Sequence, residues 1–152
     1  MSVIETERQI RYWLLDMDGV LIHEEDPIPG APEFINRLKE LEIPFLVLTN
    51  SSIYSRRDLS ARLHRSGLEV PEKSIWTSAL ATATFLRDQR PNGSAFVVGE
   101  PGLATAMHEA GYTINESDPA YVVLGETRTY SFERITQAIR LSRRLSDGVA
   151  AL

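Results

Sequence analysis

The stretch LLDMDGVL, residues 14–21, runs apolar residues directly into two acids, Asp16 and Asp18, with Gly19 close behind them. Together with the preceding Tyr and Trp, it predicts a short buried strand that ends at the acids. This arrangement is costly, because two carboxylates held about 4 Å apart repel by roughly 4 kcal/mol at an effective dielectric constant of about 20. A divalent cation is the simplest group that would offset the repulsion.

Strands and helices alternate along the rest of the chain. Apolar runs predict further strands at 43–50, 94–100 and 120–126, and helical spacing of apolar residues predicts helices at 31–42, 55–68, 78–89, 101–112 and 131–145. Ser78 and Ser131 are the expected N-caps of two helices, and Pro91 with Gly93 marks 87–95 as the best linker. This order indicates parallel strands joined by right-handed crossovers, which is an α/β fold.

Composition narrows the class of protein. A chain of 152 residues that is 43% hydrophobic can bury a core, and a net charge of −5 without a basic block argues against a nucleic-acid partner. The sequence contains no cysteine, which excludes disulfides and thiolate chemistry. Residues 1–10 lack the pattern of a signal peptide, and no apolar run is long enough to cross a membrane. We therefore expect a cytoplasmic protein without a membrane partner.

Small polar residues follow the second predicted strand, as the acids follow the first. They are Thr49, Asn50 and Ser51. Ligands of open α/β sheets bind beyond the carboxyl ends of the strands, so neighbouring strands would place both groups at one crevice. Residues i and i+2 of a strand share a face, which gives Asp16 and Asp18 one target, and Gly19 would let the backbone approach a ligand. Amides and hydroxyls at 49–51 suit phosphate oxygens, although a strand-end turn and a helix N-cap are the structural alternatives.

Several segments are similar to one known family. DMDGVL resembles the first motif of the haloacid dehalogenase superfamily, and LVLTNSS resembles its second motif. PIPGA, TSALATATFL, VVGEPGL and VVLGETRTYSFERITQAIRL resemble successive segments of its NagD-like and p-nitrophenyl-phosphatase-like members, from about residue 11 to about residue 141. The resemblance implies a Rossmann-like core of parallel strands with flanking helices, and an inserted α/β cap. Residues 1–90 would form the N-terminal half of the core and residues 91–152 part of the cap.

The resemblance also implies an activity and roles for the site residues. It implies a Mg²⁺-dependent phosphomonoester hydrolase that acts on a small phosphorylated metabolite through an aspartyl-phosphate. Asp16 would be the nucleophile and Asp18 the general acid and base, with Mg²⁺ on the Asp16 carboxylate and the Asp18 backbone carbonyl. Four residues would hold the phosphoryl group: Thr49, Asn50, Ser51 and Gly19.

The sequence also departs from the family pattern. The family uses a lysine in a GKP-like segment and a later acidic motif near GDxxxTD, and neither is present; Lys39 and Lys73 fall on a predicted helix and turn. We therefore expect a chain truncated at its C-terminus, with little or no phosphatase activity. Exposed apolar surface of the incomplete core would favour a homodimer or other association.

Two other classes of function compete with the phosphatase. The first is a non-catalytic remnant that binds Mg²⁺ or phosphate, or acts by association. The second is a phospho-acceptor receiver domain, in which the acceptor aspartate lies on a later strand than an early acidic pair. Here both acids follow the first strand and LVLTN contains none, so the order of residues argues against a receiver.

Overall fold

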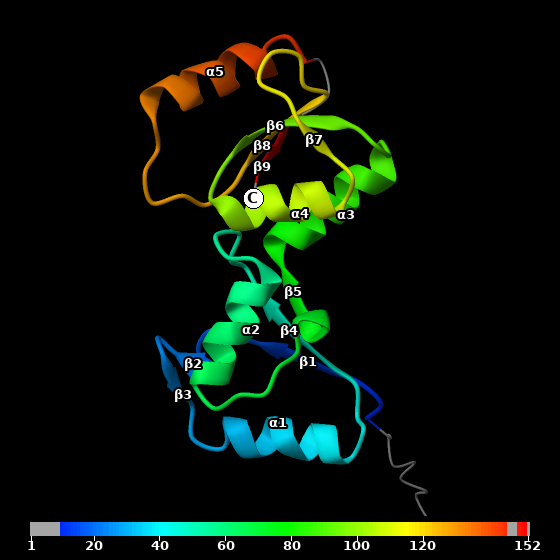
Figure 1. Cartoon of the computed structure of the whole chain (residues 1–152), viewed down its shortest axis with the longest axis vertical. Coiled ribbons are helices and arrows are strands. Elements are labelled where there is room, and N and C mark those ends of the chain that lie inside the picture. Colours follow the sequence, from blue (N-terminus) through cyan, green and yellow to red (C-terminus); the bar gives the residue numbers. More distant parts are fainter. Residues whose placement is uncertain (1–9, 146–148, 152) are drawn as a thin grey trace, which may run out of the picture.

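A computed structural model describes residues 10–145 and 149–151. Two parallel sheets with flanking helices lie one beyond the other along the length of the molecule (Figure 1). The predicted α/β class is confirmed by this arrangement. Residues 1–9, in which the sequence predicts no signal peptide, lie outside the described residues. Within the part that is described, no helix is long and apolar enough to cross a membrane.

The first unit is a three-stranded parallel sheet. Its strands are β1 (Trp13–Asp16), β4 (Phe45–Thr49) and β5 (Ile75–Thr77), and they pair in the order β1-β4-β5. Two helices, α1 (Ala31–Glu40) and α2 (Arg56–Arg65), connect successive strands. Both crossovers run in the same direction across the sheet, and both helices pack on the same face.

The core of the first unit shows why the helices form where they do. Leu15, Val47 and Ile75 are neighbours across the three strands, and they pack against the apolar stripes of α1 and α2. Ser55 begins α2 with a capping box, in which its hydroxyl accepts from the Asp58 N–H and the Asp58 carboxylate accepts from the Ser55 N–H. Gly67, at φ +78°, lies two residues beyond the end of α2 and makes the turn expected there.

Short elements complete the first unit and were not predicted from the sequence. β2 (Ile22–His23) and β3 (Asp26–Pro27) form a small antiparallel hairpin directly after the acids. A single 3₁₀ turn, η1 (Glu72–Ser74), leads into β5. These segments are two or three residues long, too short for a hydrophobic period to appear.

The second unit is a four-stranded parallel sheet covered on both faces. Its strands are β6 (Ser94–Val98), β7 (Thr113–Ile114), β8 (Tyr121–Leu124) and β9 (Val149–Ala151), in the order β7-β6-β8-β9. Helices α3 (Ser78–Gln89) and α4 (Pro101–Glu109) share one core with the sheet, and α5 (Phe132–Ser142) shares a second core with its opposite face. The result is three layers, with helices on both faces of the sheet.

Helix α3 belongs to the second unit although it follows β5 without a connecting loop. Its residues Ala79, Ala83 and Leu86 share a core with β6, α4 and β8. The buried Tyr112 hydroxyl lies 2.7 Å from the carbonyl oxygen of Leu86, and burial raises the pKa of this phenol. The segment 87–95 therefore lies inside the second unit, and the two cores separate between β5 and α3. The assignment of residues 1–90 to the core of the family and of residues 91–152 to its cap stays a prediction.

The N-cap of α3 differs from the predicted one. The side chain of Thr77, the last residue of β5, accepts a hydrogen bond from the Leu80 N–H at 3.1 Å. Ser78 lies one residue inside the helix, and its hydroxyl donates instead to the carbonyl oxygen of Asn50 at 2.8 Å. The prediction of Ser78 as the cap is therefore wrong, whereas Ser131 does cap α5.

The two units differ in how completely their sheets are covered. On the face of the first sheet opposite α1 and α2, Leu14 is 69% exposed and Trp76 is 38% exposed. Their strand neighbours on this face, Leu46 and Leu48, are half-buried. β1 also pairs with β4 alone within the described residues, so one edge of the sheet is open. Parallel sheets are normally covered on both faces, which makes this an unusual surface.

Candidate active site

The carboxyl ends of β1 and β4 bring the predicted site residues together. Asp16 lies opposite Leu48 in the parallel ladder, so Thr49 stands one residue beyond it on the neighbouring strand. The Thr49 hydroxyl lies 3.5 Å from Oδ2 of Asp18, at the long limit of a hydrogen bond. Two residues that are 31 positions apart in sequence thus meet at the strand ends.

The acidic segment continues the alternation of the strand beyond its last residue. Leu15 and Met17 are buried in the first core, whereas Asp16 and Asp18 are exposed. The Met17 N–H donates to Leu48 O at 3.0 Å and also lies 2.9 Å from Oδ1 of Asp16, which accepts from it. Gly19 adopts φ +81° and donates its N–H to Ile22 O at 2.8 Å, so it makes the turn that leads into the hairpin.

The polar residues after β4 form a structured loop. The Ser51 N–H donates to the Thr49 hydroxyl at 3.2 Å, and the Ser51 hydroxyl accepts from the Ile53 N–H at 3.3 Å. Asn50 is exposed, and its carbonyl oxygen accepts the hydrogen bond from Ser78. Because Ser55 is the N-cap of α2, the three residues do not serve as its cap. That structural alternative is excluded, and of the three residues Thr49 contacts an acid, Asp18.

The donor set at the strand ends suits a hard divalent cation. Mg²⁺ binds oxygen ligands and is commonly held by one or two carboxylates together with water and phosphate oxygens. Asp16 and Asp18 supply such carboxylates, and they are exposed enough for a small ion to reach them. No group of three or more His, Cys, Asp or Glu side chains within residues 10–145 and 149–151 could form a fuller cage. The two lysines, Lys39 in α1 and Lys73 in η1, are exposed.

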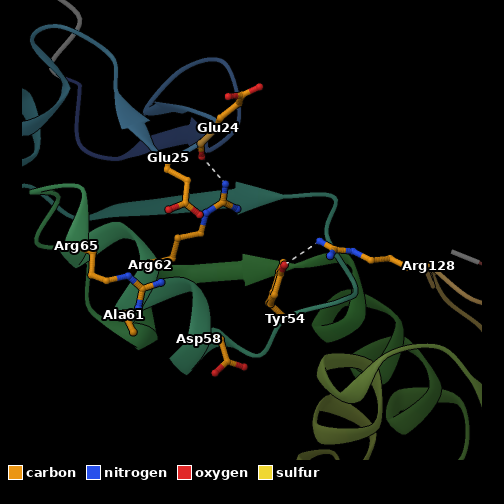
Figure 2. A pocket seen from close by; sticks show the side chains of 8 residues that line it. All are labelled: Glu24, Glu25, Tyr54, Asp58, Ala61, Arg62, Arg65 and Arg128. Atoms are coloured by element: carbon orange, nitrogen blue, oxygen red, sulfur yellow. Dashed lines mark hydrogen bonds between the residues drawn. The ribbon is translucent and has the colours of Figure 1, made fainter.

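A polar cavity of about 580 Å³ lies between the hairpin turn, α2 and a loop of the second unit (Figure 2). Arg62 donates from Nη2 to the carbonyl oxygen of Glu24, while its Nε is buried without a partner. From the opposite side, Nη2 of Arg128 lies 3.2 Å from the Tyr54 hydroxyl, as Figure 2 shows. The cavity is lined by Glu24, Glu25, Tyr54, Asp58, Ala61, Arg62, Arg65 and Arg128, but not by Asp16, Asp18 or Thr49.

The sequence did not reveal the residues that join the loop after β4, residues 50–54, to the second unit. Ser52, buried at 2% exposure, accepts from the Glu126 N–H at 2.9 Å, and Gly102 donates its N–H to Ile53 O at 3.0 Å. The only sequence signal was a glycine in the first turn of a predicted helix. Such a glycine can mark a close backbone approach, but it does not identify the partner.

Comparison with known proteins gives consistent results. Residues 13–113 match the haloacid dehalogenase-like hydrolase family. The chain is 58% identical over 129 residues to dihydroxyacetone phosphatase of Corynebacterium glutamicum, covering 85% of this chain and 47% of that protein. It is 39% identical over 129 residues to ribonucleotide monophosphatase NagD of Escherichia coli K12, covering 85% of this chain and 51% of that protein.

Solved structures show the same relationship. The structure of E. coli NagD superposes with a TM-score of 0.84 at 36% identity, covering 91% of this chain and 55% of that one. A 4-nitrophenylphosphatase from Thermotoga maritima gives a TM-score of 0.86 at 32% identity, covering 93% and 54% respectively. The chain therefore spans about half the length of the relatives it matches.

Proposed function

Since the chain belongs to the haloacid dehalogenase-like hydrolases, we propose that it carries the nucleophile and phosphate-holding part of a Mg²⁺-dependent phosphomonoester hydrolase. The observation that carries this proposal is the contact between the Thr49 hydroxyl and Asp18 at the ends of neighbouring strands. A phosphoryl group at these strand ends would meet a nucleophilic carboxylate from one strand and hydrogen-bond donors from its neighbour.

In the proposed reaction, the Asp16 carboxylate attacks phosphorus while the bond from phosphorus to the ester oxygen breaks. Asp18 donates a proton to the leaving oxygen. The Asp18 carboxylate then takes a proton from water, whose oxygen attacks the aspartyl-phosphate. Inorganic phosphate leaves and the Asp16 carboxylate is restored. The Thr49 hydroxyl, the Asn50 amide and Ser51 hold the phosphoryl oxygens. Gly19, whose N–H donates to Ile22 O, lets the backbone approach them.

The Asp16 carboxylate and the Asp18 backbone carbonyl would hold Mg²⁺. When bound, the ion would offset the repulsion between the acids and neutralise charge on the phosphate. The substrate would be a small phosphorylated metabolite. The names of the relatives, which include an acid sugar phosphatase, a dihydroxyacetone phosphatase and a ribonucleotide monophosphatase, support this class.

We also propose that this chain alone has little or no turnover. It spans about half of its relatives, and the lysine and the later acidic motif of the family pattern are missing. Removal of one group that stabilises a transition state typically costs about 10²–10³ in rate. The alternative is a non-catalytic chain that binds Mg²⁺ and phosphate, and the same missing groups favour it.

Hydrolysis of p-nitrophenyl phosphate by the purified chain, with Mg²⁺ and with EDTA, separates these proposals. We expect slow, EDTA-sensitive hydrolysis or none, with inorganic phosphate binding in either case. Robust Mg²⁺-dependent turnover would contradict the low-activity proposal. Absence of both turnover and Mg²⁺-dependent phosphate binding would contradict the assignment of the site itself.

The open face of the first sheet supports a proposal about association. Leu14, Leu46, Leu48 and Trp76 form a continuous apolar surface over three strands, and no helix within the described residues covers it. We propose that a second copy of the chain covers this surface, because the same face on both copies forms a self-complementary contact.

Leu14→Lys is expected to weaken self-association of the chain by about tenfold or more, because burying a leucine side chain contributes roughly 1.5–3 kcal/mol. Leu41→Lys is the matched control, since Leu41 is 49% exposed at the end of α1, away from the open face. Sedimentation velocity over a range of concentrations measures the effect. Equal association by both variants, or a wild-type chain that stays monomeric throughout, would rule out this interface.

A further inference from the structure

The loop between β4 and α2, residues 50–54, docks directly onto the second unit. In Figure 1 this loop rises from the first unit to the start of α4. The carbonyl oxygen of Ile53 accepts from the Gly102 N–H at 3.0 Å, and the Ser52 hydroxyl accepts from the Glu126 N–H at 2.9 Å. Two residues of one short loop are thus held by two separate segments of the second unit.

The packing at this contact leaves no room for a side chain on Gly102. A Cβ atom there would lie 2.5 Å from the carbonyl carbon of Tyr54 and 2.6 Å from the Ile53 oxygen, which are backbone atoms. A Cβ atom on Gly125 would lie 2.6 Å from Leu103 Cδ2 and 3.1 Å from the Ser52 hydroxyl. The loop therefore packs closely against two glycines of the second unit.

The same loop leads by hydrogen bonds to the acids. Ile53 donates its N–H to the Ser51 hydroxyl at 3.3 Å, and Ser51 donates its N–H to the Thr49 hydroxyl at 3.2 Å. The Thr49 hydroxyl in turn contacts Asp18. Ile53 thus binds the second unit through its carbonyl group and the site loop through its N–H. A short series of hydrogen bonds therefore connects Gly102 to Thr49.

We propose that docking of the second unit sets the position of the Thr49–Ser51 group, with Ser52 and Gly102 as positioning residues. The part of this inference that concerns phosphate rests on the proposed function. Coupling between two sites is reciprocal, so phosphate bound at the loop also tightens the docking of the second unit. Neither residue touches the acids, and both act through the loop backbone.

The first test measures binding of inorganic phosphate in Mg²⁺ by titration calorimetry. Ser52→Ala removes the acceptor for the Glu126 N–H and is expected to weaken phosphate binding by at least about fivefold, within the usual range of coupling between sites. Ser60→Ala is the matched control, because it also removes one serine hydrogen bond, to Val70 O at 2.7 Å, but within the first unit. Binding within twofold of wild type in Ser52→Ala would overturn the inference.

The second test needs no phosphate. Gly102→Ala is expected to speed amide hydrogen exchange at Ser51 and Ile53 by about tenfold or more, since opening of the loop exposes both N–H groups. Gly93→Ala is the control, because its Cβ would meet the Tyr112 ring at 2.9 Å, inside the second unit. Faster exchange confined to α4 would overturn the inference. If the wild-type chain binds no phosphate but the Ser51 amide still responds, the proposed function fails and the coupling stands.

Discussion

Asp16→Asn is expected to reduce any Mg²⁺-dependent phosphate-ester hydrolysis by this chain by at least about 10³-fold, because loss of a covalent nucleophile removes the intermediate itself. Asparagine keeps the size of the side chain and an oxygen that can accept from the Met17 N–H. Asp16 is exposed, so the change should leave the fold intact. The effect is therefore on chemistry, measured as initial rates at saturating p-nitrophenyl phosphate.

The matched control for this variant is Asp26→Asn, which makes the same substitution at another exposed carboxylate, in β3 of the hairpin. Thermal unfolding of both variants checks that neither loses structure. If Asp16→Asn hydrolyses the substrate as fast as the wild type and Asp26→Asn, Asp16 is not the nucleophile.

Phe96→Ala should produce the largest loss of stability among truncations of buried side chains to alanine in the second unit. Phe96 is fully buried, and the Arg134 guanidinium lies 4.3 Å from its ring centroid. Truncation of a buried phenylalanine typically costs about 3–5 kcal/mol, because it leaves a cavity as well as losing apolar burial. Urea unfolding followed by circular dichroism measures the loss. The control is Phe85→Ala, since Phe85 is 57% exposed and should cost within about 0.5 kcal/mol.

Tryptophan fluorescence, recorded in the same urea titration, follows the unfolding of the first unit alone. Both tryptophans of the chain, Trp13 and Trp76, lie in strands of the first unit. Phe96→Ala leaves its cavity in the core of the second unit. It should therefore lower the urea midpoint followed by circular dichroism more than the urea midpoint followed by fluorescence. Similar destabilisation by Phe96→Ala and Phe85→Ala would contradict the packing described for β6.

Much of the fold could be predicted because the longer elements carry strong periodic patterns. The helical stripes of α1, α4 and α5 appear directly in the spacing of apolar residues, and predicted and observed ends differ by a few residues. β5 and β9 could not be found in the same way, because IWT and VAA are three residues long. Periodicity also says which face of α3 is buried but not which sheet buries it.

The site was predictable to the extent that it depends on strand ends. Asp18 and Thr49 lie at the carboxyl ends of two predicted parallel strands, so they are expected to be close if those strands are neighbours. The structure brings the two side chains into contact. The docking of Ser52 against Glu126 could not be foreseen, because these residues lie 74 positions apart and neither belongs to a periodic element. Contacts of this kind depend on how the two folded units pack against each other, which local sequence patterns do not encode.

Thr77 ends β5 and also caps α3, so the two units are joined there without a single intervening residue. A flexible linker would let the two units separate, but a direct strand-to-helix junction keeps them in contact. The loop before α2 and the ion pair between Arg56 and Glu109 join the same two units at further points. The second unit is therefore held against the first at several points and not at one.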